Sequence, residues 1–290
     1  MADQDRRAAG RIEGGTFNAP VLVSGTQNNH HHHHHRSSRA QVVAGIAVLM
    51  LGAVAVVAFF AHRLYVSSPD YRRGVEQDLV EKVVPGETYE KLKQTIGTGP
   101  DYSFRLPTGN TIHQYERQWE TLQLLENASG MVLSVGVYAK DKEFKPTVAL
   151  GGQRITLNAP VDRAAPRFLP AAANAYCGAH KSGYFEGYFP MPNAFKAMNF
   201  VVGASNAESE LDLRSMCGQL GGTLCSAPQV PTENALSPEF AECLLATPGG
   251  QRIRRETAAS VIVYTAPGAA LVDDMLFPPD VVAAGAVNFR

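Results

Sequence analysis

The chain has 290 residues, of which 45% are hydrophobic and 18% charged, and its 26 basic and 27 acidic side chains leave a formal net charge of −1. This length allows one or two domains. The balanced charge argues against a nucleic-acid-binding protein, which would carry a basic face, and the apolar content excludes a fully disordered chain.

Residues 1–39 are expected to form a cytoplasmic disordered or low-complexity tail, because they show no helical periodicity and little apolar mass. Within residues 11–29, short β-prone pieces are bracketed by glycines and followed by amide side chains, which can stack in register in a fibril. This block resembles the N-terminal amyloid-signalling motifs of bacterial proteins linked to nucleotide-sensing receptors. The residues that carry the resemblance are Gly15, Phe17, Val21, Val23, Gly25 and Gln27.

A plain disordered tail is the alternative interpretation of this block. It is followed by a run of six histidines, His30–His35, which is either native or a purification tag and receives no function.

The segment Ala40–Ala61 carries no charged residue over 22 positions. At the helical rise this is roughly 33 Å, which is enough to cross the hydrocarbon core of a membrane. The sequence therefore predicts an uncleaved single-pass signal anchor in the lipid bilayer. Gly45 and Gly52 share a face that would let helices approach closely, so self-association stays open.

All four cysteines follow this segment, at Cys177, Cys217, Cys225 and Cys243. An even number on one side of a membrane suits an oxidising compartment and predicts two disulfide bonds. We therefore expect a cytoplasmic N-terminus and an extracytoplasmic C-terminal domain. Three pairings are open, and Cys217 with Cys225 is favoured because it closes a short, glycine-rich loop.

Residues 62–82 are interpreted as a stalk with a short helix that begins at Val75, and residues 83–140 as a helix followed by an antiparallel meander. Thr88 can cap a helix over Tyr89–Ile96, and Gly97 can end it. The predicted strands are Ser103–Leu106, Thr111–Tyr115, Trp119–Leu125 and Met131–Tyr138. The fold class is therefore α+β, with one or two helices covering an antiparallel sheet.

The residues that open this module resemble a known pattern. Val84-Pro85-Gly86-Glu87-Thr88, with Leu92, Ile96-Gly97 and Gly99-Pro100, is similar to the pGxTxxxVxxxLGxP opening of the helix-plus-meander modules in outer-membrane assembly lipoproteins and β-lactamase-inhibitor repeats. One residue is inserted before Pro100, and the lipid-attachment cysteine of the lipoproteins is missing.

More broadly, residues 65–290 are similar to a bacterial membrane-anchored family with a domain of unknown function, in which one N-terminal span precedes this module and a block rich in Tyr, Phe and Gly. The resemblance implies membrane anchoring. It implies no reaction and transfers no functional residues.

Residues 141–290 are predicted to be a loop-rich, disulfide-supported part that contains short strands and packs onto the meander rather than folding alone. Ser237 is expected to cap a helix that runs to Leu245. The aromatic residues of this part have two interpretations, an exposed interaction surface or core. They are Tyr184, Phe185, Tyr188 and Phe189.

The sequence contains none of the common hydrolase, phosphate-binding, zinc or calcium motifs, and it predicts no catalytic, metal or cofactor site. His62, His113 and His180 are interpreted as isolated surface or core residues. The main hypothesis is a non-enzymatic extracytoplasmic module that binds a protein or envelope component. The alternatives are a transmembrane signal transducer whose amyloid-like block assembles in the cytoplasm, and an envelope enzyme with dispersed residues.

Overall fold

The structure, a computed structural model, describes residues 37–150, 153–165, 168–177, 182–189, 198–205, 217–218 and 236–270. The proposed amyloid-like block, the histidine run and Cys225 lie outside the described residues. The chain divides into two compact units, Met1–Phe60 and Ala61–Arg290.

One long helix, α1, covers Ser37–Val66. Its segment Val42–Val66 has a mean hydropathy of 2.8 and no buried residue in its apolar window, and it is long and apolar enough to cross a membrane. The apolar helix predicted from the sequence is therefore present, and it continues beyond Ala61. It ends before Ser67, whose hydroxyl donates to the Leu64 carbonyl oxygen.

Helix α2 covers Pro69–Lys82 and begins six residues earlier than the predicted start at Val75. The Ser68 hydroxyl accepts a hydrogen bond from the Tyr71 N–H at 3.3 Å, and Pro69 occupies the first helical position, where a missing N–H is harmless. The segment predicted as a stalk is thus partly helical, because Ser68 and Pro69 start the helix before Val75.

Helix α3 covers Tyr89–Ile96, as predicted. The Thr88 hydroxyl accepts from the Lys91 N–H, and Gly97 ends the helix in the left-handed region at φ 79°. These two local signals are sufficient to fix both ends of a helix.

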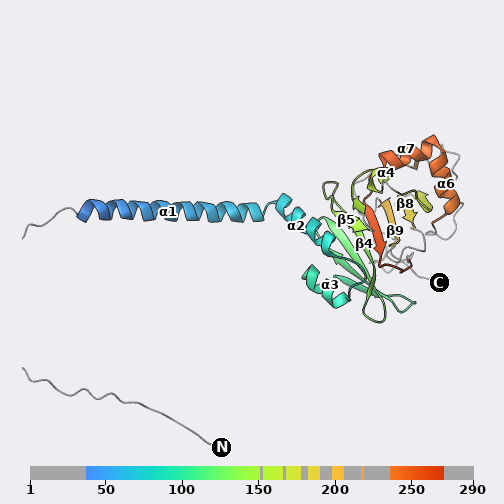
Figure 1. Cartoon of the computed structure of the whole chain (residues 1–290), viewed down its shortest axis with the longest axis horizontal. Helices are drawn as coiled ribbons and strands as arrows, with labels where there is room; N and C mark the ends of the chain where they lie inside the picture. The colour runs from blue at the N-terminus through green and yellow to red at the C-terminus, as the bar shows by residue number, and fades with distance from the viewer. Residues whose placement is uncertain are drawn as a thin grey trace, which may run out of the picture. The chain divides into compact units, whose positions relative to one another are not determined.

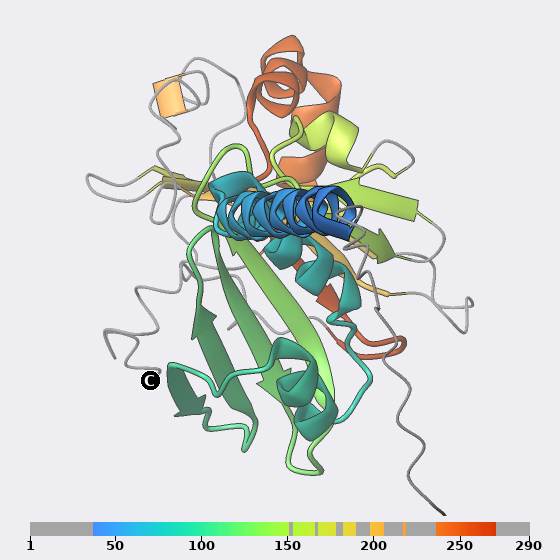
Figure 2. The same ribbon diagram turned by 90° about the vertical axis from the view of Figure 1, so that its left-hand side faces the viewer.

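Eight strands form one antiparallel sheet in the order β1-β2-β3-β4-β10-β9-β8-β7, so the fold is α+β (Figures 1 and 2). The strands are β1 Tyr102–Arg105, β2 Thr111–Glu116, β3 Glu120–Glu126, β4 Val132–Ala139, β7 Ala172–Cys177, β8 Ser182–Tyr188, β9 Phe200–Ser205 and β10 Val261–Thr265. The first four are the predicted meander, shifted by one residue at several ends.

The two halves of the folded unit share this sheet through β10, which pairs with β4 from Val261 opposite Tyr138 to Thr265 opposite Ser134. On its other side, β10 pairs with β9. The C-terminal half therefore packs onto the meander, as expected, and does so by continuing its sheet.

The remaining elements are small. They are the hairpin of β5 Thr147–Leu150 and β6 Gln153–Thr156, and the helices α4 Val161–Ala164, α6 Pro238–Ala246 and α7 Pro248–Glu256. Ser237 caps α6 as predicted, with its hydroxyl accepting from the Phe240 N–H at 3.1 Å. Figure 1 places α2 and α3 beside the first half of the sheet, and α6 and α7 beside the second half.

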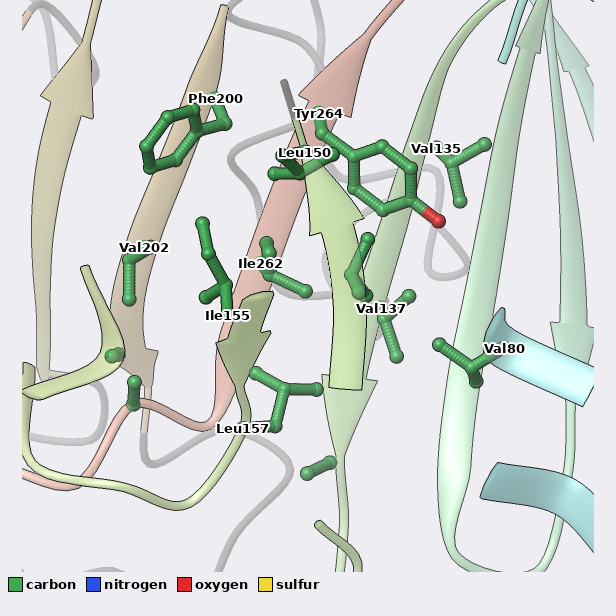
Figure 3. Close-up of a cluster of buried hydrophobic side chains, with 14 of the residues drawn as sticks. Val80, Val135, Val137, Leu150, Ile155, Leu157, Phe200, Val202, Ile262 and Tyr264 are labelled. Carbon is green, nitrogen blue, oxygen red and sulfur yellow. The ribbon is translucent and has the colours of Figure 1, made fainter. Parts of the chain in front are cut away.

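The larger hydrophobic core lies on the sheet face that the helices and the β5–β6 hairpin cover. Figure 3 shows that its side chains come from three sources and point toward one another. The sheet contributes Val135, Val137, Phe200, Val202, Ile262 and Tyr264, the hairpin and the residue after it contribute Leu150, Ile155 and Leu157, and α2 contributes Val80. A smaller cluster occupies the opposite face of the sheet.

One disulfide bond joins Cys177, at the end of β7, to Cys217, with 5.8 Å between the two Cα atoms. The favoured pairing of Cys217 with Cys225 is therefore wrong. That pairing was supported only by a short, glycine-rich loop, whereas the observed bond joins cysteines 40 residues apart. Cys243 is also disulfide-bonded.

We expect Gly250→Ala to destabilise the fold by about 1–3 kcal/mol, the usual cost of overpacking a core. An added Cβ would lie 2.3 Å from the Leu244 carbonyl oxygen and 2.5 Å from the Leu244 Cα, so backbone would have to move. Chemical denaturation of the full chain in detergent measures the change.

Gly74→Ala in α2 is the matched control, because nothing lies within 4 Å of its added Cβ. It should stabilise the chain by about 0.5–1 kcal/mol through helix propensity. Equal effects of the two variants would contradict the packing argument.

Candidate functional site

Three of the four aromatic residues proposed as an interaction surface are buried. Tyr184, Phe185 and Tyr188 are at most 4% exposed, because β8 lies between β7 and β9 and both of its faces are covered. The surface interpretation is therefore wrong for these three, and the alternative, core, describes them. Phe189 is different, with 42% of its surface exposed.

Tyr184 and Tyr188 instead surround a buried carboxylate, Glu186, on the same face of β8. Both phenol groups donate hydrogen bonds to Glu186. Arg254 of α7 adds a bidentate contact, with Nε 2.7 Å from Oε1 and Nη2 3.2 Å from Oε2. Every oxygen of this fully buried carboxylate is thus satisfied, as a buried charge requires.

The pKa values of the partners reflect the same charge. Burial and the negative charge of Glu186 raise the pKa of Tyr184 well above its usual range. Burial would lower the pKa of Arg254, but the hydrogen bonds and charge of Glu186 raise it instead. Tyr184 and Arg254 therefore stay protonated, and we interpret the network as a structural tie between α7 and β8.

His113, interpreted as an isolated histidine, has polar partners on both sides. Its Nδ1 lies 2.9 Å from the Ser103 hydroxyl, and its Nε2 lies 2.7 Å from Glu126 Oε2. The Tyr89 ring stacks on the imidazole with 3.9 Å between ring centroids. The sequence did not reveal this hydrogen-bonded row because Ser103 and His113 meet only as cross-strand partners of β1 and β2.

A serine, a histidine and a carboxylate in a row invite comparison with the triad of serine hydrolases. In that triad the serine contacts Nε2 and the acid contacts Nδ1, whereas here the two nitrogens are exchanged. Ser103 also lies on the exposed edge strand β1. We therefore interpret the hydrogen bonds between Ser103, His113 and Glu126 as structural contacts that stabilise the edge of the sheet.

A third cluster forms where α2 meets the sheet, and it differs from the other two. Glu76 of α2 and Glu120 of β3 share one guanidinium, with Arg117 Nε 3.9 Å from Glu76 Oε1 and 3.8 Å from Glu120 Oε1. These are ion-pair distances but too long for hydrogen bonds. The Glu120 side chain is 0% exposed, and that of Glu76 is 13% exposed.

Both oxygens of Glu120 are buried without a hydrogen-bond partner, as are the Nε atoms of Arg117 and Arg73. They make up four of the six such side-chain atoms among the described residues. Burial and the nearby charge of Glu76 raise the pKa of Glu120 to about 8. Because unsatisfied buried polar groups are rare in stable folds, this cluster is the candidate functional site.

No group of three or more His, Cys, Asp or Glu side chains that could hold a metal ion occurs within the described part of the chain. The sequence offered no signal for the cluster of Glu76, Arg117 and Glu120, since these residues are separated by up to 44 positions.

No protein-family model matches the chain, and no curated protein matches it. Among solved structures, an extracellular protein containing an SCP domain from Bacillus anthracis str. Ames is similar at a TM-score of 0.28 and 10% identity. The similarity covers 66% of this chain and 45% of that one, so this chain spans less than half the length of the structure it matches.

Replacing Arg254 with alanine should destabilise the fold by about 3 kcal/mol or more, because it leaves the charge of Glu186 buried without its cationic partner. Denaturant unfolding of the full chain in detergent measures the loss. Arg255→Ala is the matched control on the same helix, and its exposed side chain should matter by less than about 0.5 kcal/mol. Similar losses in the two variants would contradict the structural role of the network.

Proposed function

We propose that the chain is a single-pass membrane protein that holds an α+β domain on the extracytoplasmic side, where the domain binds a protein or envelope component without catalysing a reaction. The observation that carries this proposal is the exposure of α1, in which large apolar side chains from Val42 to Phe60 are 54–75% exposed. Exposing this much apolar surface to water is unfavourable, whereas the hydrocarbon core of a bilayer can surround it.

The orientation rests on the cysteines. A disulfide bond between Cys177 and Cys217 favours an oxidising compartment for the folded unit. The N-terminal tail then lies in the cytoplasm. The opening pattern from Val84 to Pro100 further supports membership in the bacterial membrane-anchored family that the sequence resembles.

The binding role is supported by exposed apolar side chains near the β7 edge of the sheet. Leu169 is 73% exposed and Phe189 is 42% exposed. Because Ala172 pairs with Gly187, the two residues extend the same end of the β7–β8 pair. Exposed apolar side chains at the end of a strand pair are suited to protein contact.

A second candidate function is transmembrane signalling, in which the domain transmits its state to the cytoplasmic tail. The short connection between the first two helices favours this function, since α2 begins at Pro69, only three residues after α1 ends at Val66. Only Ser67 and Ser68 therefore separate α2 from the membrane-length helix.

The topology makes a specific prediction. Combining Met50→Arg with Val54→Arg in the middle of α1 should make the chain extractable from membranes by alkaline carbonate, because two central arginines cost about 5–7 kcal/mol of insertion free energy. The pair Met50→Leu and Val54→Leu should stay in the membrane. In right-side-out vesicles, added protease should digest the domain, and digestion only after permeabilisation would reverse the proposed orientation.

For the binding role, a photo-crosslinking amino acid at Leu169 of the full chain should give a discrete adduct in intact membranes. The same probe at Arg154, an exposed position on β6, is the control and should give none. Equal labelling from both positions, or from neither, would argue against a partner at the β7 edge.

A further inference from the structure

We propose that Glu76, Arg117 and Glu120 form a proton-dependent latch that holds α2, the helix next to the membrane-length segment, against the sheet. In the protonated state the latch is closed. Loss of one proton opens it. The latch lies within the folded unit Ala61–Arg290. Only the statement that it senses the pH of the outer compartment rests on the proposed function.

Helix α2 is attached to the sheet in two parts. Its C-terminal part is held by apolar contacts, since Leu79, Val80 and the following Val83 are buried, and the Tyr264 hydroxyl donates to the Val83 carbonyl oxygen at 2.7 Å. The α2 residues before Leu79 are exposed or half-buried. In the middle of the helix the attachment is polar, because the Trp119 N–H donates to Glu76 Oε2 at 3.4 Å.

The charges in this polar part balance only while Glu120 is neutral. Arg117 and Glu76 then form a pair of opposite charges at the edge of the site. An ionised Glu120 would add a second anion beside the same guanidinium, at a fully buried position where neither of its oxygens has a donor. Such an uncompensated buried charge is strongly unfavourable.

The other charged groups facing Glu120 do not replace the missing partner. Lys140, beyond β4, donates instead to Glu116 and to the Arg117 carbonyl oxygen. Arg73 of α2 donates to Asp70 and lies over the Trp119 ring. Tyr264 of β10 stays neutral, since burial and then the Glu120 charge raise its pKa.

The direction of the pH effect follows from the two states. Burial and Glu76 raise the pKa of Glu120 to about 8 when α2 is docked, whereas an exposed glutamate titrates near 4.5. The docked state thus holds a proton that the released state has lost, so docking is favoured below about pH 4.5 and weakens as the pH rises through about 8. Glu116 does not oppose this change, because although burial alone would raise its pKa, the hydrogen bonds from Lys140, Gln114 and Thr121 lower it.

Hydrogen exchange of the full chain in detergent tests the latch. We expect the protection factors of the α2 amides, corrected for intrinsic exchange, to fall at least tenfold between about pH 6.5 and about pH 9. In Glu120→Gln, which mimics the neutral carboxyl, protection should change by less than about threefold over the same range. The matched control is Glu81→Gln, an exposed position on the same helix, which should follow the wild type.

Three results would overturn the proposal: unchanged α2 protection in the wild type, the same tenfold loss in Glu120→Gln, or a loss confined to elements other than α2. If Glu120→Gln does not fold, Glu76→Gln takes its place. Removing the competing carboxylate leaves Arg117 to Glu120 alone, so the loss of protection should shrink, and an undiminished loss would refute the latch. These readouts do not depend on membrane orientation, so failure of the latch and failure of the topology are distinguishable.

Discussion

The pairing of β10 with β4 is the interaction on which the folded unit depends. Five residue pairs, from Val261 opposite Tyr138 to Thr265 opposite Ser134, join the last described strand to the end of the N-terminal meander. Because β10 also pairs with β9, the meander and the β7–β9 strands become one sheet with a shared core. Without β10, each half would expose an unpaired edge and part of its apolar face.

Two buried glutamates in this sheet differ in how their carboxylates are hydrogen-bonded. Glu186 receives hydrogen bonds from two tyrosines and a bidentate contact from Arg254, so its charge is compensated. Glu120 is equally buried and receives none. The first arrangement fixes one structure, whereas the second makes the position of α2 depend on a proton.

The helix that Glu120 faces follows shortly after α1 in the chain. The cluster contacts α2 at Glu76, in the middle of the helix, and only Ser67 and Ser68 separate that helix from α1. Under the proposed function, the domain would bind a partner at the end of the β7–β8 pair, and under the proposed latch its helix α2 would respond to the surrounding pH. The binding proposal and the signalling proposal are therefore compatible.

The sequence by itself determined the features that depend on neighbouring residues. The uncharged stretch predicted α1, Thr88 and Gly97 fixed the ends of α3, Ser237 marked the start of α6, and alternating residues with turn signals predicted the meander. Each of these signals acts over a few positions, because capping, turn formation and helix propensity are local interactions.

Only the tertiary structure decided which distant residues meet. Cys177 and Cys217 are 40 residues apart, Glu186 and Arg254 are 68 apart, and Glu76 lies 44 positions before Glu120. The aromatic residues of β8 were ambiguous for the same reason, since their burial depends on the strands on either side. Strand order is set by long-range pairing and shared burial, and no local pattern in the chain encodes it.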